Sequence, residues 1–200
     1  MTRILALIAV VLSASAVSAQ EIKSVYTPFD TKSCRHQKGT DVEDYGSWTC
    51  RGLNGMSIRI SAGDQRMYVS YGRASDDEDL ASTQTFPGFN DVYKGTVEWR
   101  VAMKGGKQVP FATILRWNVM TEKDHEAAGP VAASGRVLVV TRLNPGGVCH
   151  VGYVDARANP NANELAQQLA DDKARAFQCG KDKPAVAGKT SPGLHMPAGE

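Results

Sequence analysis

The chain has 200 residues, a formal net charge of +2 and 42% hydrophobic residues. This length is sufficient for one domain with a buried core. The near-neutral charge argues against a nucleic-acid partner or an anionic membrane surface. We therefore expect a single domain that does not bind nucleic acid.

Residues 1–19 have the pattern of a cleavable secretory signal. Arg3 supplies a positive charge, Ile4–Leu12 an apolar run, and Val17–Ala19 the small residues that precede a cleavage site, which we place between Ala19 and Gln20. The apolar run is shorter than the roughly 20 residues that a membrane-spanning helix needs. We therefore expect the protein to be periplasmic or secreted, without a membrane span.

All four cysteines follow the signal: Cys34, Cys50, Cys149 and Cys179. An even number of cysteines in an oxidising compartment favours disulfide bonds, and the absence of a Cys-x-x-Cys motif argues against a zinc site. Of the three pairings that four cysteines allow, we predict the local one, Cys34–Cys50 and Cys149–Cys179.

Strand-like segments account for most of the chain between residues 46 and 154. Met56, Ile58 and Ile60 alternate with polar residues, which is typical of a strand with one buried face. Pro110 should lie at a sheet edge or a strand start, because it has no N–H to donate. The predicted strands are residues 46–53, 56–61, 66–71, 96–103, 109–118, 135–142 and 148–154. Because turn residues separate them, we predict an antiparallel β-meander of about seven strands, in a twisted or partly closed sheet.

One helix is predicted over residues 162–177, where apolar side chains form a stripe at helical spacing. Asn159 should cap it, and Asp171 and Arg175 should pair on its solvent face. An antiparallel sheet with one C-terminal helix packed on it makes the fold class α+β.

The predicted domain organisation has three parts. The signal occupies residues 1–19, a single disulfide-bonded domain residues 20–180, and a disordered tail residues 181–200, because the tail has few apolar residues to bury. Within the domain, residues 76–95 should form a loop that is first polar and then aromatic, and residues 120–133 an exposed excursion.

Few polar residues in the sequence are candidates for a catalytic or metal-binding site. His150 and Asp155 should face opposite sides of a strand, so we expect Asp155 and Arg157 to shape the turn before the helix. Glu98 is a candidate for a site built across strands, although a lone Glu on a wet sheet face is usually only solvated. The run Asp76–Asp79 lacks the ligand spacing of known calcium loops and should be a solvated loop. We assign no catalytic residue, cofactor or metal.

The segment from Thr85 to Tyr93 carries three aromatic rings on a Pro-Gly loop: Phe86, Phe89 and Tyr93. They are candidates for contact with a partner, because rigid aromatic side chains are common interface anchors. The alternative is that the rings fold back and plug one end of the sheet, which is the default use of aromatic residues. We favour the plug.

Five segments resemble a group of small, uncharacterised exported proteins of Gram-negative bacteria: Ser47–Leu53, Tyr68–Gly72, Glu98–Arg100, Pro110–Arg116 and Cys149–Pro160. The resemblance runs from about Ser24 to Cys179. It implies a periplasmic location and no known activity.

We therefore expect an exported protein that binds a partner or ligand without catalysing a reaction, an interpretation reached by elimination. Two alternatives stay open. The first is an inhibitor of a cell-wall hydrolase or protease that presents a rigid loop, either the one from Phe86 to Tyr93 or the one around His125. The second is an enzyme whose site is assembled across strands.

Overall fold

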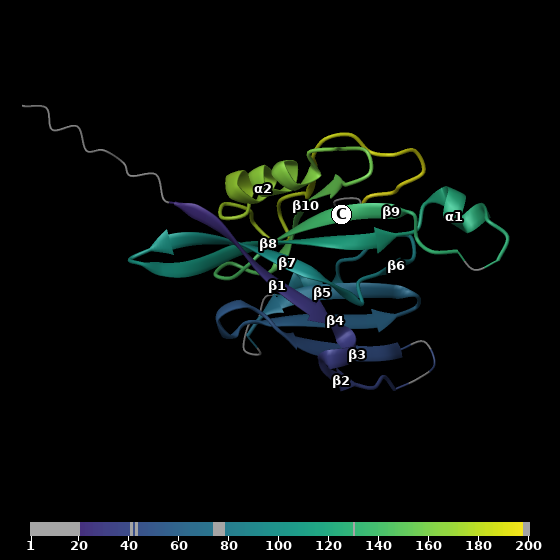
Figure 1. Cartoon of the computed structure of the whole chain (residues 1–200), viewed down its shortest axis with the longest axis horizontal. Coiled ribbons are helices and arrows are strands. Elements are labelled where there is room, and N and C mark those ends of the chain that lie inside the picture. The colour runs from purple at the N-terminus through teal and green to yellow at the C-terminus, as the bar shows by residue number, and fades with distance from the viewer. Residues whose placement is uncertain (1–20, 41, 43, 74–78, 130, 198–200) are drawn as a thin grey trace, which may run out of the picture.

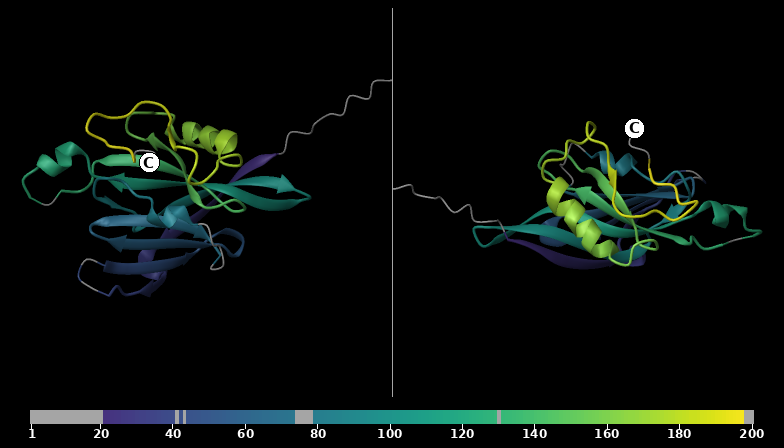
Figure 2. Two further views of the ribbon diagram at one scale, coloured as in Figure 1. Left: turned by 180° about the vertical axis from the view of Figure 1, so that it is seen from behind. Right: turned by 90° about the horizontal axis from the view of Figure 1, so that it is seen from above.

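The computed structural model describes residues 21–197, except residues 41, 43, 74–78 and 130. Two sheets and one long helix form three layers (Figure 1). The larger sheet lies in the middle, with helix α2 on one face and the smaller sheet on the other (Figure 2). The signal pattern of residues 1–19 lies outside the described residues.

The larger sheet has seven strands. In the order in which they pair, these are β1 (Ile22–Asp30), β7 (Lys94–Lys104), β8 (Lys107–Val119), β9 (Gly135–Arg142), β10 (Cys149–Asp155) and β11 (Ala185–Val186), with β6 (Asn90–Asp91) pairing with one end of β8. All pairs are antiparallel except β10 with β11. The α+β class, the antiparallel meander and the C-terminal helix are thus confirmed.

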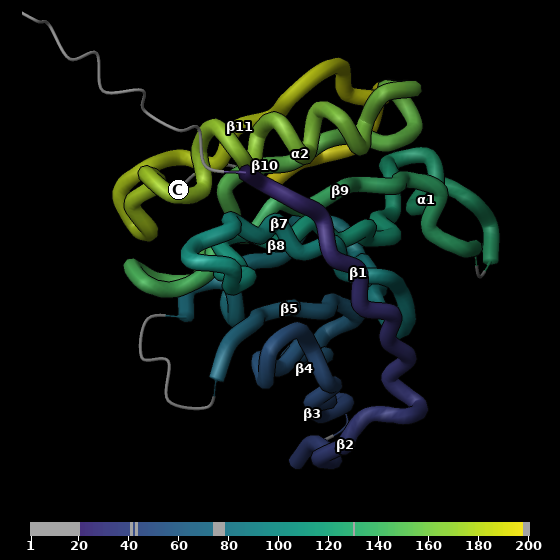
Figure 3. Tube along the Cα trace, turned by 60° about the vertical axis from the view of Figure 1, so that its left-hand side comes forward, coloured from purple at the N-terminus to yellow at the C-terminus, as the bar shows by residue number. Residues whose placement is uncertain are grey.

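The smaller sheet holds four strands: β2 (Arg35–Gln37), β3 (Asp44–Arg51), β4 (Ser57–Gly63) and β5 (Arg66–Gly72). The β4–β5 hairpin turns at Asp64 and Gln65, between the predicted strands 56–61 and 66–71. This sheet stacks below the larger one (Figure 3). The meander is therefore divided between two sheets, an arrangement that the strand pattern alone did not indicate.

The main core lies between the two sheets. Each sheet contributes the apolar residues that alternate along its strands and point toward the other sheet. The largest fully buried side chains of this core include Ile58, Ile60, Val69, Tyr71, Trp99, Leu115 and Trp117. The predicted alternation of Met56, Ile58 and Ile60 thus reflects a real buried face, although Met56 is only partly buried at its margin. The disulfide Cys34–Cys50 ties the β2 end of the smaller sheet to β3, as predicted.

A second core lies between the larger sheet and α2 (Ala162–Lys173). Ala166 and Ala170 are fully buried there, so the helix backbone can approach the sheet closely. The predicted disulfide Cys149–Cys179 is formed and joins β10 to the segment after the helix. Asn159 does not cap the helix, which begins after Asn161. The side chain of Asn159 donates instead to the backbone carbonyls of Asp155 and Lys189.

Pro110 lies in β8 where the β7–β8 hairpin extends beyond β9. Pairing of β8 with β9 begins only at Ala112. The ring therefore removes no ladder hydrogen bond on that side, which is the edge position that we predicted. The alternative, a strand start, is wrong, because β8 already begins at Lys107. Gly105 and Gly106 form the tip of this hairpin with φ of 56° and 74°, values that glycine adopts without steric cost.

The C-terminal segment is docked. Strand β11 pairs with Gly152 and Tyr153 of β10, and Leu194 is only 6% exposed. The amides of Lys189 and Ser191 donate to the side chains of Asn159 and Asp155. The expectation of disorder therefore does not hold for residues 181–197. The amino-acid composition of the tail did not predict this docking. Buried polar side chains of the domain, rather than apolar residues of the tail, supply much of the attachment.

Four shorter helical segments are also described, among them single turns of 3-10 helix at Thr31–Ser33 and Leu53–Gly55. Helix α1 (Glu122–Glu126) lies in the long connection between β8 and β9, which protrudes from the end of the larger sheet (Figure 1). A single turn of 3-10 helix at Leu80–Thr83 follows β5. No helix in the described part of the chain is long and apolar enough to cross a bilayer.

Candidate functional site

The three aromatic residues of the Thr85–Tyr93 segment have different environments. Phe86 is fully buried and packs against Trp117 and Tyr153, which makes it a plug of the inter-sheet core. Tyr93 is 48% exposed, and Phe89 is partly exposed. The plug prediction is therefore right for Phe86, which is too buried to contact a partner, whereas Phe89 and Tyr93 stay accessible.

Asn90 holds the Thr85–Tyr93 segment against both sheets through four hydrogen bonds. Its side-chain oxygen accepts from the amide of Met67 at 3.1 Å, and its side-chain nitrogen donates to Thr85 Oγ1 and the Gly88 carbonyl. Its own amide donates to the Gln65 carbonyl. Because Asn90 belongs to the larger sheet and Met67 to the smaller one, this residue joins both sheets and fixes the position of the neighbouring rings.

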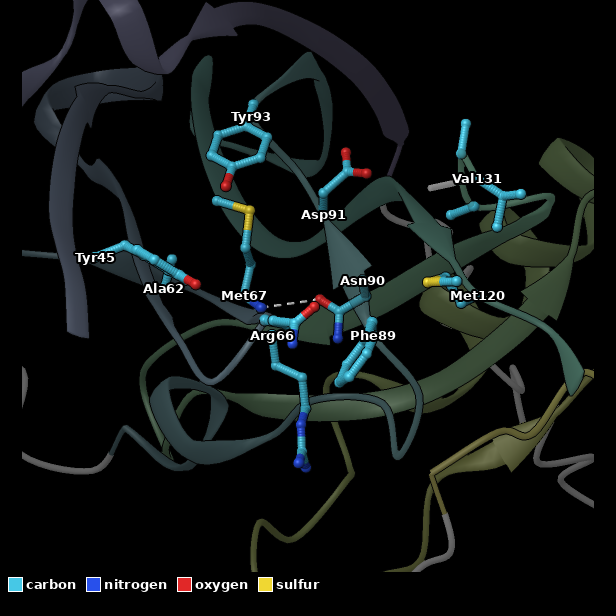
Figure 4. Close-up of a pocket in the computed structure, with 13 residues that line it drawn as sticks. Tyr45, Ala62, Arg66, Met67, Phe89, Asn90, Asp91, Tyr93, Met120 and Val131 are labelled. Carbon is cyan, nitrogen blue, oxygen red and sulfur yellow. Dashed lines mark hydrogen bonds between the residues drawn. The ribbon is translucent and has the colours of Figure 1, made fainter. Parts of the chain in front are cut away.

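A pocket of about 320 Å³ opens beside Asn90 (Figure 4). Its wall comes from both sheets and from the β8–β9 connection: Tyr45, Ala62, Gln65, Arg66, Met67, Phe89, Asn90, Asp91, Tyr93, Met120 and residues 131–133. We call it the aromatic pocket. Figure 4 shows Tyr93 and Met67 on one side and Val131 and Met120 on the other, with Arg66 extending away from Tyr93.

Exposed apolar side chains are concentrated at this pocket. Among the described residues, eight large hydrophobic side chains are exposed, and three of these, Tyr45, Tyr93 and Val131, line the aromatic pocket. Single exposed hydrophobic residues are ordinary, but a cluster at a concave site is typical of a binding surface. Tyr45 and Val131 carried no recognisable signal in the sequence, because each depends on a fold contact to reach the pocket.

The aromatic surface continues from the pocket onto the smaller sheet. Trp48 packs edge-on against Tyr93 with ring centroids 6.2 Å apart, and His36 stacks on Trp48 at 4.8 Å. His36 and Trp48 are direct partners in the β2–β3 ladder. Trp48 is the one partly exposed tryptophan of three, since Trp99 and Trp117 are buried, so its fluorescence can report on this surface.

The charged groups of the pocket are held in place. Asp91 accepts from the Asn118 side chain at 2.7 Å, and Arg66 pairs with Asp64 at 2.9 Å. Partial burial raises the pKa of Tyr93, and the nearby Asp91 carboxylate and Tyr45 raise it further. The Tyr93 phenol is therefore protonated at neutral pH and can donate a hydrogen bond to a ligand.

The loop around His125 joins the aromatic segment. The ring of Phe89 packs edge-on against His125 at 5.3 Å. The base of this loop is clamped by Asp124, which accepts from the amides of Thr121 and Ser134. Burial acts to raise the pKa of Asp124, but these hydrogen bonds lower it to about 2. The two loops that the sequence singled out thus form one continuous surface.

His150, Asp155 and Arg157 do not form a site. A bulge between His150 and Gly152 breaks the strand alternation, and His150 points into the core, with Nδ1 3.0 Å from the Tyr153 hydroxyl. Burial lowers the pKa of His150 to about 3, so the ring is neutral. Asp155 accepts from the amides of Arg157 and Ala158, as expected for a residue that shapes the turn before the helix.

Glu98 is not on a wet face. It is 8% exposed and lies beneath α2, where Ser24 and Gln167 donate to it. Arg100 lies 3.6 Å from Glu98 and forms two hydrogen bonds with Asp171 of the helix. Asp171 therefore faces the sheet, and its carboxylate pairs with Arg100 rather than with Arg175, contrary to the helix pattern.

Most of the acidic run Asp76–Asp79 lies outside the described residues. Asp79 is described, and its carboxylate contacts Arg59 and Ser70. It is therefore part of a side-chain network between β4, β5 and the following turn. In the described part of the chain, no group of three or more His, Cys, Asp or Glu side chains is arranged to hold a metal ion.

Comparison of the sequence with protein-family models, with curated proteins and with solved structures gives no match. Function is therefore inferred from the residues alone.

Proposed function

We propose that this chain is an exported, non-catalytic binding protein, and that the aromatic pocket is its recognition site. The observation that carries the proposal is the clustering of the half-exposed side chains of Tyr45, Tyr93 and Val131 around one concave site that both sheets build. Aromatic and apolar walls with a few oriented polar groups are the usual composition of ligand and partner sites.

Export is proposed on two grounds. Residues 1–19 have the pattern of a signal that is cut between Ala19 and Gln20. The domain contains two disulfides, which is consistent with an oxidising compartment outside the cytoplasm. A periplasmic location and kinship with the group of small exported proteins of Gram-negative bacteria belong to the same proposal.

The enzyme alternative receives little support from the residues that the sequence singled out. His150 is buried and neutral, and Asp155 is occupied by backbone amides. Glu98 pairs with a cation instead of with a second carboxylate. None of these three groups forms the acid–base pair that a site assembled across strands would need.

A larger pocket of about 570 Å³ lies between residues 83–87 and the C-terminal segment. Leu80 is the one exposed large hydrophobic residue among those described on its wall, and Phe86 and Tyr153 at its base are buried. The aromatic pocket has three such exposed side chains on its wall, so we assign the recognition site there instead.

The inhibitor alternative is favoured by one observation. The contact between Phe89 and His125, together with the Asp124 clamp, ties the start of the protruding β8–β9 connection to the aromatic pocket. A preorganised loop of this kind is what an inhibitor presents to a hydrolase. An inhibitor would use the same surface, so it is a special case of partner binding.

The test is capture of partners from a periplasmic extract by the purified protein. Three variants are compared with the wild type: the pair Tyr45→Ala with Tyr93→Ala, the single change Phe89→Ala, and the control Val109→Ala. Val109 is 42% exposed but lies near the opposite end of β8 from the pocket. We expect a specific partner with the wild type and the control, and at least tenfold lower recovery with the tyrosine pair.

Binding of the captured molecule should also change the emission of Trp48, which contacts Tyr93. A Trp48→Phe variant should lose that signal and keep the partner. Equal recovery with all variants, or no specific partner with the wild type, would remove the aromatic pocket from consideration.

A further inference from the structure

The outer face of the larger sheet carries a second pocket, beside α2. Tyr26, Glu98 and Ile114 stand in direct register across β1, β7 and β8. These residues contribute to a pocket of about 380 Å³ that is also lined by Lys94, Arg116, Gln167 and others. It lies on the opposite face of the sheet from the inter-sheet core and shares no residue with the aromatic pocket.

Glu98 presents one carboxylate oxygen to this pocket. All its contacts converge on Oε1, which accepts from Ser24 Oγ at 2.5 Å and Gln167 Nε2 at 2.8 Å and lies 3.6 Å from Arg100. Oε2 receives no hydrogen bond from the described residues. Some polar side-chain atoms of the described residues are inaccessible to solvent and lack a hydrogen-bond partner, and Oε2 is not one of them. Since Glu98 lines the pocket, Oε2 is open to it.

The negative charge at the pocket floor is not fully compensated. Arg100 is shared between Glu98 and Asp171, which takes two of its hydrogen bonds. The three groups together carry a formal charge of −1, and Glu98 is only 8% exposed. Burying a carboxylate is costly unless a cation and hydrogen bonds compensate it. A ligand ammonium group placed on Oε2 would supply both.

Positively charged side chains also line this pocket. Arg116 is two residues beyond Ile114 on the same face of β8, so it is a diagonal neighbour of Glu98, with about 7–8 Å between such positions. Arg116 and Lys94 are exposed, and neither forms an ion pair with Glu98 in the described structure. Opposite charges therefore line the same pocket without forming an ion pair with each other.

We propose that this pocket binds a small zwitterion of amino-acid or dipeptide size. The ligand ammonium donates to Glu98 Oε2, and its carboxylate accepts from Arg116, whose guanidinium can form a two-point contact. Tyr26, which is 58% exposed and stands opposite Glu98, provides an aromatic wall for the ligand side chain. A simple cation would leave Arg116 unpaired, and a simple anion would be repelled by Glu98.

The test is ligand-observed NMR and calorimetry with the purified protein. The probes are L-phenylalanine and glycyl-L-phenylalanine. Each is compared with its N-acetyl derivative, which lacks the ammonium, and with its amide, which lacks the carboxylate. We expect at least one zwitterion to bind at least tenfold more tightly than either of its singly charged derivatives.

Two variants locate the site. Arg116→Gln removes an exposed cation without disturbing the core, and Glu98→Gln keeps an acceptor at Oε1 while removing the charge. Each should weaken binding of the zwitterion at least tenfold, whereas the control Arg51→Gln, an exposed position on the other sheet, should not.

If Glu98→Gln unfolds, Arg116→Gln decides the matter on its own. Failure of both zwitterions to bind the wild type, equal binding of the singly charged probes, or unchanged binding by Arg116→Gln would overturn the proposal. None of these results bears on the aromatic pocket, whose variants are tested separately.

Discussion

Replacing Asp171 by asparagine tests whether the buried ion network holds α2 on the larger sheet. Asp171 receives two hydrogen bonds from Arg100, whose side chain is only 10% exposed. The change keeps the shape of the side chain and removes its charge. Arg100 then stays buried with a single remaining carboxylate, Glu98, at 3.6 Å.

The expected cost follows from the burial of each partner. Removing one partner of a buried ion pair costs about 3–5 kcal/mol, because the other charge is left uncompensated. Here 25% of the Asp171 side chain is exposed, and Glu98 still faces Arg100. We therefore expect a loss of about 2–3 kcal/mol in the free energy of unfolding. For a domain of this size, the melting temperature would fall by about 4–12 °C.

The measurement is urea unfolding followed by circular dichroism, with Asp172→Asn as the control. Asp172 is the next residue of the helix and is exposed, so its replacement should change stability by less than about 0.5 kcal/mol. A double-mutant cycle with Arg100→Met should give a coupling energy of about 1.5–3 kcal/mol. Equal stability of the two asparagine variants would show that the network does not hold the helix.

Three further predictions concern stability. Because burial lowers the pKa of His150 to about 3, below the value of about 6.5 in an unfolded chain, only the unfolded state gains a proton as the pH falls. The free energy of unfolding should therefore drop by about 2 kcal/mol between pH 7 and pH 5, and His150→Gln should flatten that slope in urea titrations. Asn90→Ala leaves a buried strand amide without its acceptor and should cost about 2–3 kcal/mol, whereas Asn161→Ala, at an exposed position without a side-chain cap, should be nearly neutral by the same assay. Ending the chain after Lys183 removes β11 and the buried Leu194, so calorimetry should show a melting temperature at least 5 °C lower, and an unchanged value would mean that the C-terminal segment is not docked.

Local pattern was sufficient for much of the fold. Strands such as Ser57–Gly63 and Arg66–Gly72 appear where alternation and a turn predicted them. Helix α2 appears where the apolar stripe lies. Both disulfides join cysteines that are close in sequence. In each case the partner that completes the structure is a near neighbour along the chain, so spacing carries the information.

The candidate sites depended on contacts between distant residues. Of the three aromatic residues proposed for partner contact, Phe86 proved to be buried, because packing on Trp117 and Tyr153 decides its exposure. The pocket also needs Tyr45 from the smaller sheet. No periodicity distinguishes such a residue from any other surface tyrosine.

The sequence by itself determined the α+β class, most strands, the helix and the cysteine pairing, because these follow from short-range periodicity and spacing. The tertiary structure decided that the meander splits into two sheets, that the C-terminal segment docks on Asp155 and Asn159, and that Glu98 is buried. These features rest on side-chain hydrogen bonds and charges that meet only after folding. Ser24 and Glu98, for example, are 74 residues apart in the chain.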